Sequence, residues 1–158
     1  MAEIGFYHLT RTPLDQALPR LLGRILAQQG RALVLCGGPE RVQALDAALW
    51  LCPEPDWLPH GMAAGSHAAH QPILLTAEDA PAPNGARYLV LLDGAESAWL
   101  GEYDRVLDLF DGHDEAAVAA ARRRWAAART AGHALTYFQQ GPRGWEKKAT
   151  SGAALATS

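Results

Sequence analysis

Hydrophobic positions along the chain follow two patterns, short continuous apolar runs and longer stretches with helical spacing. The apolar runs predict strands at residues 3–9, 31–38, 73–78, 86–94, 105–111 and 134–140. Apolar residues at three- and four-residue spacing predict helices at residues 14–26, 39–52 and 114–131. Pro19 lies within the first helical pattern, so we expect it to kink this helix or to delay its start.

The order of these elements predicts the fold class. Strands that alternate with helices favour a mostly parallel sheet covered on both faces. We therefore expect an α/β protein with a single three-layer α/β/α domain, formed by residues 1–149. Residues 53–72 are broken by prolines and glycines and are expected to form a long loop. Residues 150–158 contain few large apolar side chains, so we expect a disordered C-terminal tail.

Charge is unevenly distributed along the 158 residues, although the net charge is only −3. Residues 118–150 contain seven Arg or Lys side chains and one acid, Glu146, which gives +6, whereas residues 1–117 carry −9. The basic segment is a candidate anion-binding surface. Direct nucleic-acid binding by this segment is one alternative, and we expect it to be weak because the rest of the chain repels phosphates.

Both cysteines, Cys36 and Cys52, lie in apolar runs, which indicates buried thiols in a reducing cytoplasm rather than a disulfide framework. No apolar run approaches the roughly 20 residues that span a bilayer, and no signal-peptide pattern is present. We therefore expect a cytoplasmic protein without a membrane partner. A zinc site needs a fourth ligand, so we expect no metal at the loop histidines His60, His67 and His70.

A glycine pair follows the second predicted strand, where phosphate-binding loops precede a helix in other proteins. The stretch "CGGPERV" lacks the GK[ST] ending of a P-loop and the GxGxxG fingerprint. A nucleotide-using enzyme with its site at residues 37–40 is a second alternative, which the missing motifs disfavour. The sequence identifies no catalytic residue, and we expect neither a cofactor nor an activity of its own.

The third predicted helix places an aromatic residue between cations. Val118, Arg122, Trp125 and Arg129 are spaced by four, three and four residues, so they share one helical face. Such a face suits a ligand with an apolar end and a carboxylate, because arginine binds carboxylates bidentately. In the alternative interpretation, Trp125 packs into the core and the arginines extend past it to water.

Two further tryptophans raise the same question of core against surface. Trp50 lies near the end of the second predicted helix, and Trp57 lies in the long loop. Each is either a cover over the core or an exposed anchor for a partner. Together with Leu58 and Pro59 they would form one apolar patch, and such patches indicate binding partners.

Six stretches of the chain, in this order, carry a resemblance: "FYHL" (6–9), "LDAALW" (45–50), "WLPHG" (57–61), "RVLDLFDG" (105–112), "ARRRWAAARTAGHALTY" (121–137) and "GWEKKA" (144–149). Together they resemble the chi subunit of bacterial DNA polymerase III holoenzyme. The resemblance implies a P-loop-like topology without the phosphate loop, and a non-enzymatic adaptor that acts in DNA replication. Such an adaptor joins the clamp loader through the psi subunit and binds the acidic C-terminal tail of single-stranded DNA-binding protein. It contacts nucleic acid only indirectly, and a repair helicase is an alternative partner at the psi-binding surface.

The resemblance also assigns residues by position. Arg122 matches the arginine that holds the terminal carboxylate of the tail, and Trp125 matches an aromatic residue beside it. Other family members can carry a lysine where this chain has Val118, so we expect a pocket that is either weaker or uses Arg129 or Arg123 instead. The psi- or helicase-facing surface is assigned to Trp50, Trp57, Pro59 and His60.

Overall fold

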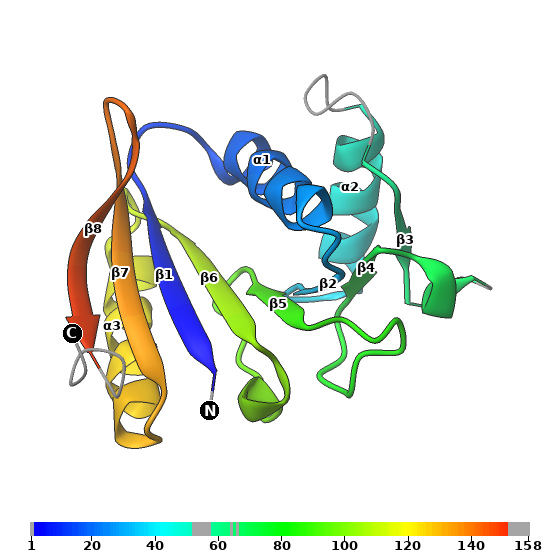
Figure 1. Ribbon diagram of the computed structural model, residues 1–158. Helices are drawn as coiled ribbons and strands as arrows, with labels where there is room; N and C mark the ends of the chain where they lie inside the picture. The colour runs from blue at the N-terminus through cyan, green and yellow to red at the C-terminus, as the bar shows by residue number, and fades with distance from the viewer. Residues whose placement is uncertain (1, 52–57, 64, 66, 152–158) are drawn as a thin grey trace.

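The strands of this protein form one sheet, described here by a computed structural model that covers residues 2–51, 58–63, 65 and 67–151 (Figure 1). In these residues the sheet has eight strands in the order β3-β4-β2-β5-β6-β1-β7-β8. Their bounds are β1 (Glu3–Leu9), β2 (Ala32–Leu35), β3 (His60–Met62), β4 (Ile73–Thr76), β5 (Tyr88–Leu91), β6 (Arg105–Asp111), β7 (Ala134–Gly141) and β8 (Gly144–Ser151). Neighbouring strands are parallel, except that β7 and β8 form an antiparallel hairpin.

Helices cover the sheet from both sides (Figure 1). On one face, α1 (Leu14–Ala27) contacts β6, and α2 (Pro39–Trp50) contacts β3 and β4. On the other face, α3 (Glu115–Thr130) contacts β1, β6 and β7. Two short 3-10 turns, η1 (Ala68–His70) and η2 (Leu100–Glu102), lie in the connections. This arrangement confirms the expected three-layer α/β/α domain with a mostly parallel sheet.

The central strands are apolar throughout because both of their faces are covered. All four residues of β2 are buried: Val34 faces the core under α1 and α2, whereas Leu33 and Leu35 join the core under α3. Burial of each such leucine contributes roughly 1.5–3 kcal/mol. Cys36 follows β2 as a buried thiol, and burial raises its pKa to about 11. Cys52 lies outside the described residues.

The structure differs from the sequence-based expectation at Pro19. This proline lies inside α1, which begins at Leu14 and continues to Ala27, so the expected late start is wrong. An internal proline costs a helix about 3 kcal/mol because it removes a hydrogen bond and crowds the preceding turn. The Pro19 ring is buried on the core side of α1, and this burial offsets part of that cost.

Both outer strands were missed by the sequence pattern. The segment expected to be one long loop contains β3, and the chain returns after β7 to form β8. Charged residues dominate the middle of β8, a composition that protects an edge strand from unwanted pairing but hides its alternation. Since β8 extends to Ser151, residues 150 and 151 belong to the sheet rather than to the expected tail. No helix among the described residues is long and apolar enough to cross a membrane.

Candidate functional site

Local sequence signals position α3 against the sheet. The Asp114 side chain caps its first turn by accepting hydrogen bonds from the backbone N–H groups of Ala116 (3.0 Å) and Ala117 (3.2 Å). Gly132, with a φ of +90°, ends the helix in the left-handed conformation that glycine allows. The buried residues of α3 are small alanines, Ala121 and Ala128, so the helix can lie close to the strands.

Trp125 lies between the core and the surface. Its ring is half-buried and makes edge-on contacts with Phe6 on β1 (centroids 5.3 Å apart) and Tyr137 on β7 (6.0 Å). Val118 is also half-buried and packs against the same hydrophobic cluster. The core therefore fixes the ring while part of it stays exposed, and ligand binding by the Trp125 stripe stays a prediction.

The arginines of α3 divide into two groups. The Arg124 guanidinium donates two hydrogen bonds to the Asp108 carboxylate on β6, Nε to Oδ2 at 2.7 Å and Nη2 to Oδ1 at 2.9 Å. Both side chains are almost inaccessible, with exposed fractions of 9% and 3%. Arg122, Arg123 and Arg129 are exposed, and within the described residues none of the three has an ion-pair partner. Arg124 therefore has a structural role, and the other three can contact a ligand.

Parallel pairing of β1 with β7 brings His8 and Tyr137 next to each other at the candidate site, a contact that the sequence did not indicate. The Nδ1 atom of His8 on β1 lies 2.6 Å from the hydroxyl of Tyr137 on β7. The Phe110 ring lies close to both, with centroids 5.1 Å from His8 and 6.1 Å from Tyr137. We call the group of His8, Arg122, Trp125 and Tyr137 the aromatic–arginine surface. The stretches "FYHL" and "LTY" contained its strand residues, but only the pairing shows that they meet.

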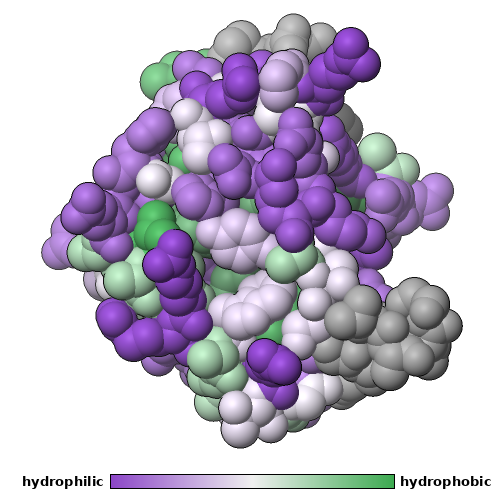
Figure 2. All heavy atoms as spheres, turned by 90° about the vertical axis from the view of Figure 1, so that its left-hand side faces the viewer, coloured by the Kyte–Doolittle hydropathy of each residue, from purple (hydrophilic) through white to green (hydrophobic). Residues whose placement is uncertain are grey.

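Arg122 is the main charge of this surface. Burial lowers the pKa of His8 from its usual 6.5, a nearby Gly112 backbone hydrogen bond opposes this, and the Arg122 charge lowers the pKa further. Burial raises the pKa of Tyr137, and the Arg122 charge opposes that shift. At neutral pH the histidine and tyrosine are therefore uncharged, and the surface has a positive charge at Arg122. Figure 2 views the molecule from the left-hand side of Figure 1, where β8 forms the edge of the sheet, and hydrophilic residues there surround a paler central area.

The second predicted surface lies at the end of α2. Trp50 is 60% exposed and its neighbour Leu51 is 84% exposed. The Trp50 ring lies over His60 with centroids 4.3 Å apart, and Pro59 beside it is half-buried. His60 itself is only 3% exposed, and its Nδ1 donates to the Leu58 carbonyl at 2.7 Å. The structure thus brings Trp50 and His60 together. Trp57 lies outside the described residues.

Comparison with known proteins gives the chain its family. The family described as "DNA polymerase III chi subunit, HolC" matches residues 1–136. The chain belongs to this family. "Probable DNA polymerase III subunit chi" of Rickettsia prowazekii (strain Madrid E) is 23% identical over 110 residues, which is 70% of this chain and 66% of that relative. The matched region thus spans just under two thirds of the relative's length.

The family match confirms the resemblance found in the sequence and places the chain among subunits of a DNA-replicating polymerase. It includes α2, β3 and α3, and with them Trp50, His60, Arg122 and Trp125. The match ends at residue 136, so Tyr137 and all of β8 lie beyond it.

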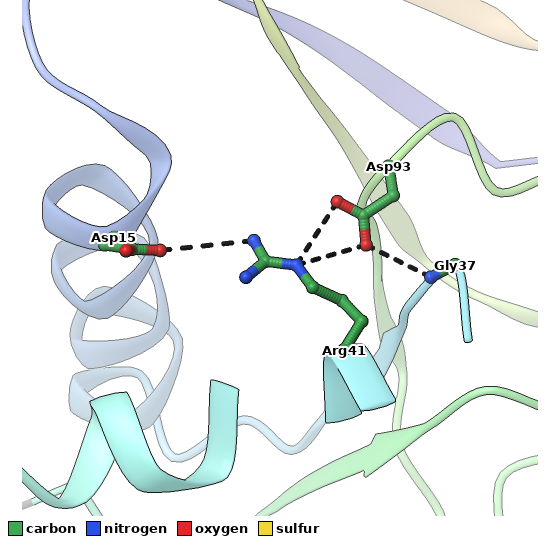
Figure 3. A network of polar contacts seen from close by, with 4 residues as sticks. All are labelled: Asp15, Gly37, Arg41 and Asp93. Atoms are coloured by element: carbon green, nitrogen blue, oxygen red, sulfur yellow. Dashed lines mark hydrogen bonds and ion pairs between the residues drawn. The ribbon is translucent and has the colours of Figure 1, made fainter. Parts of the chain in front are cut away.

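The glycine junction before α2 is occupied by the protein itself (Figure 3). The backbone N–H of Gly37 donates to the Asp93 carboxylate at 3.1 Å, and Arg41 Nε lies 3.3 Å from both oxygens of the same group. Asp15 on α1 lies 4.0 Å from Arg41. A phosphate at this junction would meet the negative charge of Asp93, which disfavours the nucleotide-using enzyme considered from the sequence.

Proposed function

We propose that this chi-family chain is a non-catalytic adaptor of the DNA polymerase III clamp-loader assembly. In this proposal the aromatic–arginine surface binds the acidic C-terminal tail of single-stranded DNA-binding protein. The observation that carries the proposal is the exposed Arg122 beside the half-buried Trp125, whose ring the core fixes against Phe6 and Tyr137. A cation next to a fixed aromatic ring matches a ligand that ends in an apolar side chain and a carboxylate.

Binding would combine one directed contact with a broader electrostatic attraction. Arg122 would donate a bidentate pair of hydrogen bonds to the terminal carboxylate, a charge-assisted contact of about 1.5–3 kcal/mol. Trp125 and Tyr137 would contact the apolar terminal residue of the tail. Arg123 and Arg129, both exposed, would attract its acidic residues. Val118 would supply apolar contact where other members of the family supply a cation.

A second docking surface is proposed at Trp50, Pro59 and His60, with the psi subunit or a repair helicase as the partner. Its support is the exposure of Trp50 and Leu51, two large apolar side chains in succession at the end of a helix. Exposed aromatic residues of this kind are frequent anchors in protein interfaces. Trp57 is included through the resemblance alone.

Calorimetric titration with a peptide of the C-terminal tail tests the main proposal. The wild-type chain should bind with an affinity that falls as salt concentration rises. Arg122→Ala should reduce the affinity at least about tenfold, since it removes a charge-assisted contact. Arg20→Ala is the control, because it removes an exposed charge from α1 on the opposite face of the sheet, and it should have a clearly smaller effect. Absence of binding, or equal losses in the two variants, would contradict the proposed site.

The nucleotide-using alternative has its own test. The Asp93 carboxylate already accepts a hydrogen bond from Gly37, so we expect titration of ATP with magnesium to give neither binding nor hydrolysis. Detectable ATP turnover by the wild-type chain, lost in a variant of residues 37–40, would favour the enzyme instead.

A further inference from the structure

Half of the sheet has one face that no helix in the described part of the chain covers. In Figure 1 this face of β1, β7 and β8 is turned to the viewer, while α1 and α2 lie over the other strands. Three aromatic rings lie on it. Tyr7 stacks on Phe138 with centroids 4.9 Å apart and planes inclined by 19°, and Trp145 of β8 contacts Tyr7 edge-on at 5.0 Å. All three rings are only partly buried.

Two cavities adjoin this aromatic cluster. One, of about 320 Å³, is lined by Tyr7 and Phe138 together with Arg105 and Lys147. The other, of about 280 Å³, lies between α1 and the β7–β8 hairpin and is lined by Trp145. Both are near the lower limit of small-ligand pockets, about 300 Å³. The rings of Tyr7 and Trp145 touch, so both cavities adjoin one aromatic cluster. We call the two cavities and this cluster together the sheet-face groove.

Cations dominate the groove. The second cavity is lined by Arg11, Arg20 and Arg24, and its described lining residues include no acid. All three arginines are exposed, as are Arg105 and Lys147 of the first cavity. Glu3 is the acid that lines the first cavity, and it lies 3.3 Å from Arg105 in an ion pair. Four cations in the groove therefore have no ion-pair partner among the described residues, in a chain whose net charge is −3.

The charges on α1 are arranged unfavourably for the isolated protein. Arg20 and Arg24 are four residues apart, so they lie on the same side of α1 and repel each other by about 0.2–0.5 kcal/mol. Arg24 is also near enough to Tyr7 to lower the pKa of that hydroxyl, against the larger effect of burial. A bound anion would relieve the repulsion, which points to an anionic ligand next to the aromatic rings.

Hydrogen bonds hold the two walls of the groove together. The Gln140 side-chain oxygen accepts from the backbone N–H groups of Thr10, Arg11 and Thr12 at 3.0, 2.8 and 3.0 Å, and its nitrogen donates to the Thr12 hydroxyl at 2.6 Å. This ties the segment that enters α1 to the β7–β8 hairpin. The groove is thus built into the fold, with the α1 arginines facing Trp145 across a fixed gap.

A bulge in the hairpin directs the β8 side chains into the groove. Tyr137 pairs with Ala149, but the next residue, Phe138, pairs with Lys147, so one residue of β8 is passed over. Lys147 consequently lies opposite Phe138 on the groove side. Without the bulge, strict alternation would pair Phe138 with Lys148.

We propose that the sheet-face groove binds a short stretch of single-stranded nucleic acid. Phosphates would contact the α1 arginines and Lys147, and bases would stack on Trp145 and Phe138, a contact worth about 1–3 kcal/mol per base in other proteins. An acidic peptide without an apolar residue would use the same cations but would leave the aromatic cluster unexplained. This contact lies on the opposite face of the sheet from α3 and does not depend on the proposed adaptor role. It departs from the expectation of only indirect contact with nucleic acid, because the groove gathers cations locally, most of them from residues 1–117, whose overall charge is −9.

Fluorescence anisotropy with a labelled short oligo(dT) at low salt tests the proposal, using the full chain. The wild type should bind, and the affinity should fall steeply with salt. Arg20→Ala/Arg24→Ala should weaken binding at least about tenfold through the loss of phosphate contacts. Arg122→Ala/Arg123→Ala removes the same charge from α3 and should change the affinity less than about twofold. Trp145→Phe, which keeps an aromatic ring, should bind more tightly than Trp145→Ala.

Three results would overturn this proposal. The first is no binding by the wild type at low salt, and the second is an equal loss in both double variants, which would indicate unspecific charge attraction. The third is an acidic peptide that binds through Arg20 and Arg24 while oligo(dT) does not, which would make the groove a peptide site. Since binding of the tail peptide is measured with Arg122→Ala, failure of either proposal can be recognised separately.

Discussion

The two surfaces proposed for protein partners differ in which of their residues the core holds. At α3, the aromatic residue Trp125 is half-buried against Phe6 and the arginine beside it, Arg122, is exposed. At the end of α2 the order is reversed, since Trp50 is 60% exposed and His60 beneath it is 3% exposed. The first surface therefore presents charge beside a fixed aromatic ring, and the second presents an apolar ring over a buried polar residue.

The polar groups buried below the two surfaces differ as well. Below α3, Arg124 and Asp108 form a bidentate ion pair; burial raises the pKa of Asp108, and the hydrogen bonds from Arg124 oppose that rise. Below Trp50, His60 lies close to the Leu58 and Asp46 carbonyl oxygens, at 2.7 and 3.2 Å, and its Nε2 lies 3.3 Å from the Asp46 carboxylate. Neighbouring arginines of α3 thus have opposite roles, since Arg124 is paired in the core and Arg122 is exposed, and substitutions can separate those roles.

The largest effect is expected at the buried ion pair. Arg124→Met leaves the Asp108 carboxylate buried without its partner, so the free energy of unfolding should fall by about 3–5 kcal/mol. Urea denaturation measures this loss. Arg123→Met, the exposed neighbour, should change it by less than about 0.5 kcal/mol. The double variant Arg124→Met/Asp108→Leu should recover most of the stability, because no charge then stays buried alone. A loss below about 1 kcal/mol in Arg124→Met would show that the pair is not structural.

An intermediate effect should separate the two tryptophans. Trp125→Ala removes a half-buried ring and its contacts with Phe6 and Tyr137, so it should cost about 2–3 kcal/mol, less than a fully buried tryptophan. Trp50→Ala removes a largely exposed ring and should cost less than about 1 kcal/mol. Urea unfolding of the two variants gives both values. Equal costs, or the reverse order, would break the distinction between an aromatic residue held by the core and one that is exposed.

The smallest effect is a shift of the His8 pKa. In the folded chain this pKa lies below 6.5, so the unfolded chain binds the proton more tightly. The stability linked to this group is therefore present above pH 6.5 and is lost as the pH falls through the folded-state pKa. NMR titration of the His8 ring measures the value, and Arg122→Gln should raise it because a repelling charge is removed. Arg123→Gln should leave it unchanged, and no shift in Arg122→Gln would mean that Arg122 is not close to His8.

Sequence patterns predicted much of the fold because strong local signals coincide with the elements that the core needs. The α3 helix illustrates this. Asp114 caps its start and Gly132 follows its end, and the observed bounds, Glu115–Thr130, lie within one residue of the expected range 114–131. The sequence pattern did not predict β3, which has only three residues at the edge of the sheet, or β8, whose charged residues show no apolar alternation. Edge strands are stabilised by pairing with their neighbours, and a sequence pattern does not contain that pairing.

By itself, the sequence determined the three-layer α/β/α class, the helix that carries the Trp125 stripe and the family of the chain. Helical spacing is a local property, so it places Arg122 and Trp125 on one face without any knowledge of the sheet. Only the tertiary structure decided that Arg124 points inward to Asp108 and that His8 meets Tyr137, a residue 129 positions away. The physical reason is that burial and strand register are set by packing between distant segments, and these contacts determine which arginines face a ligand.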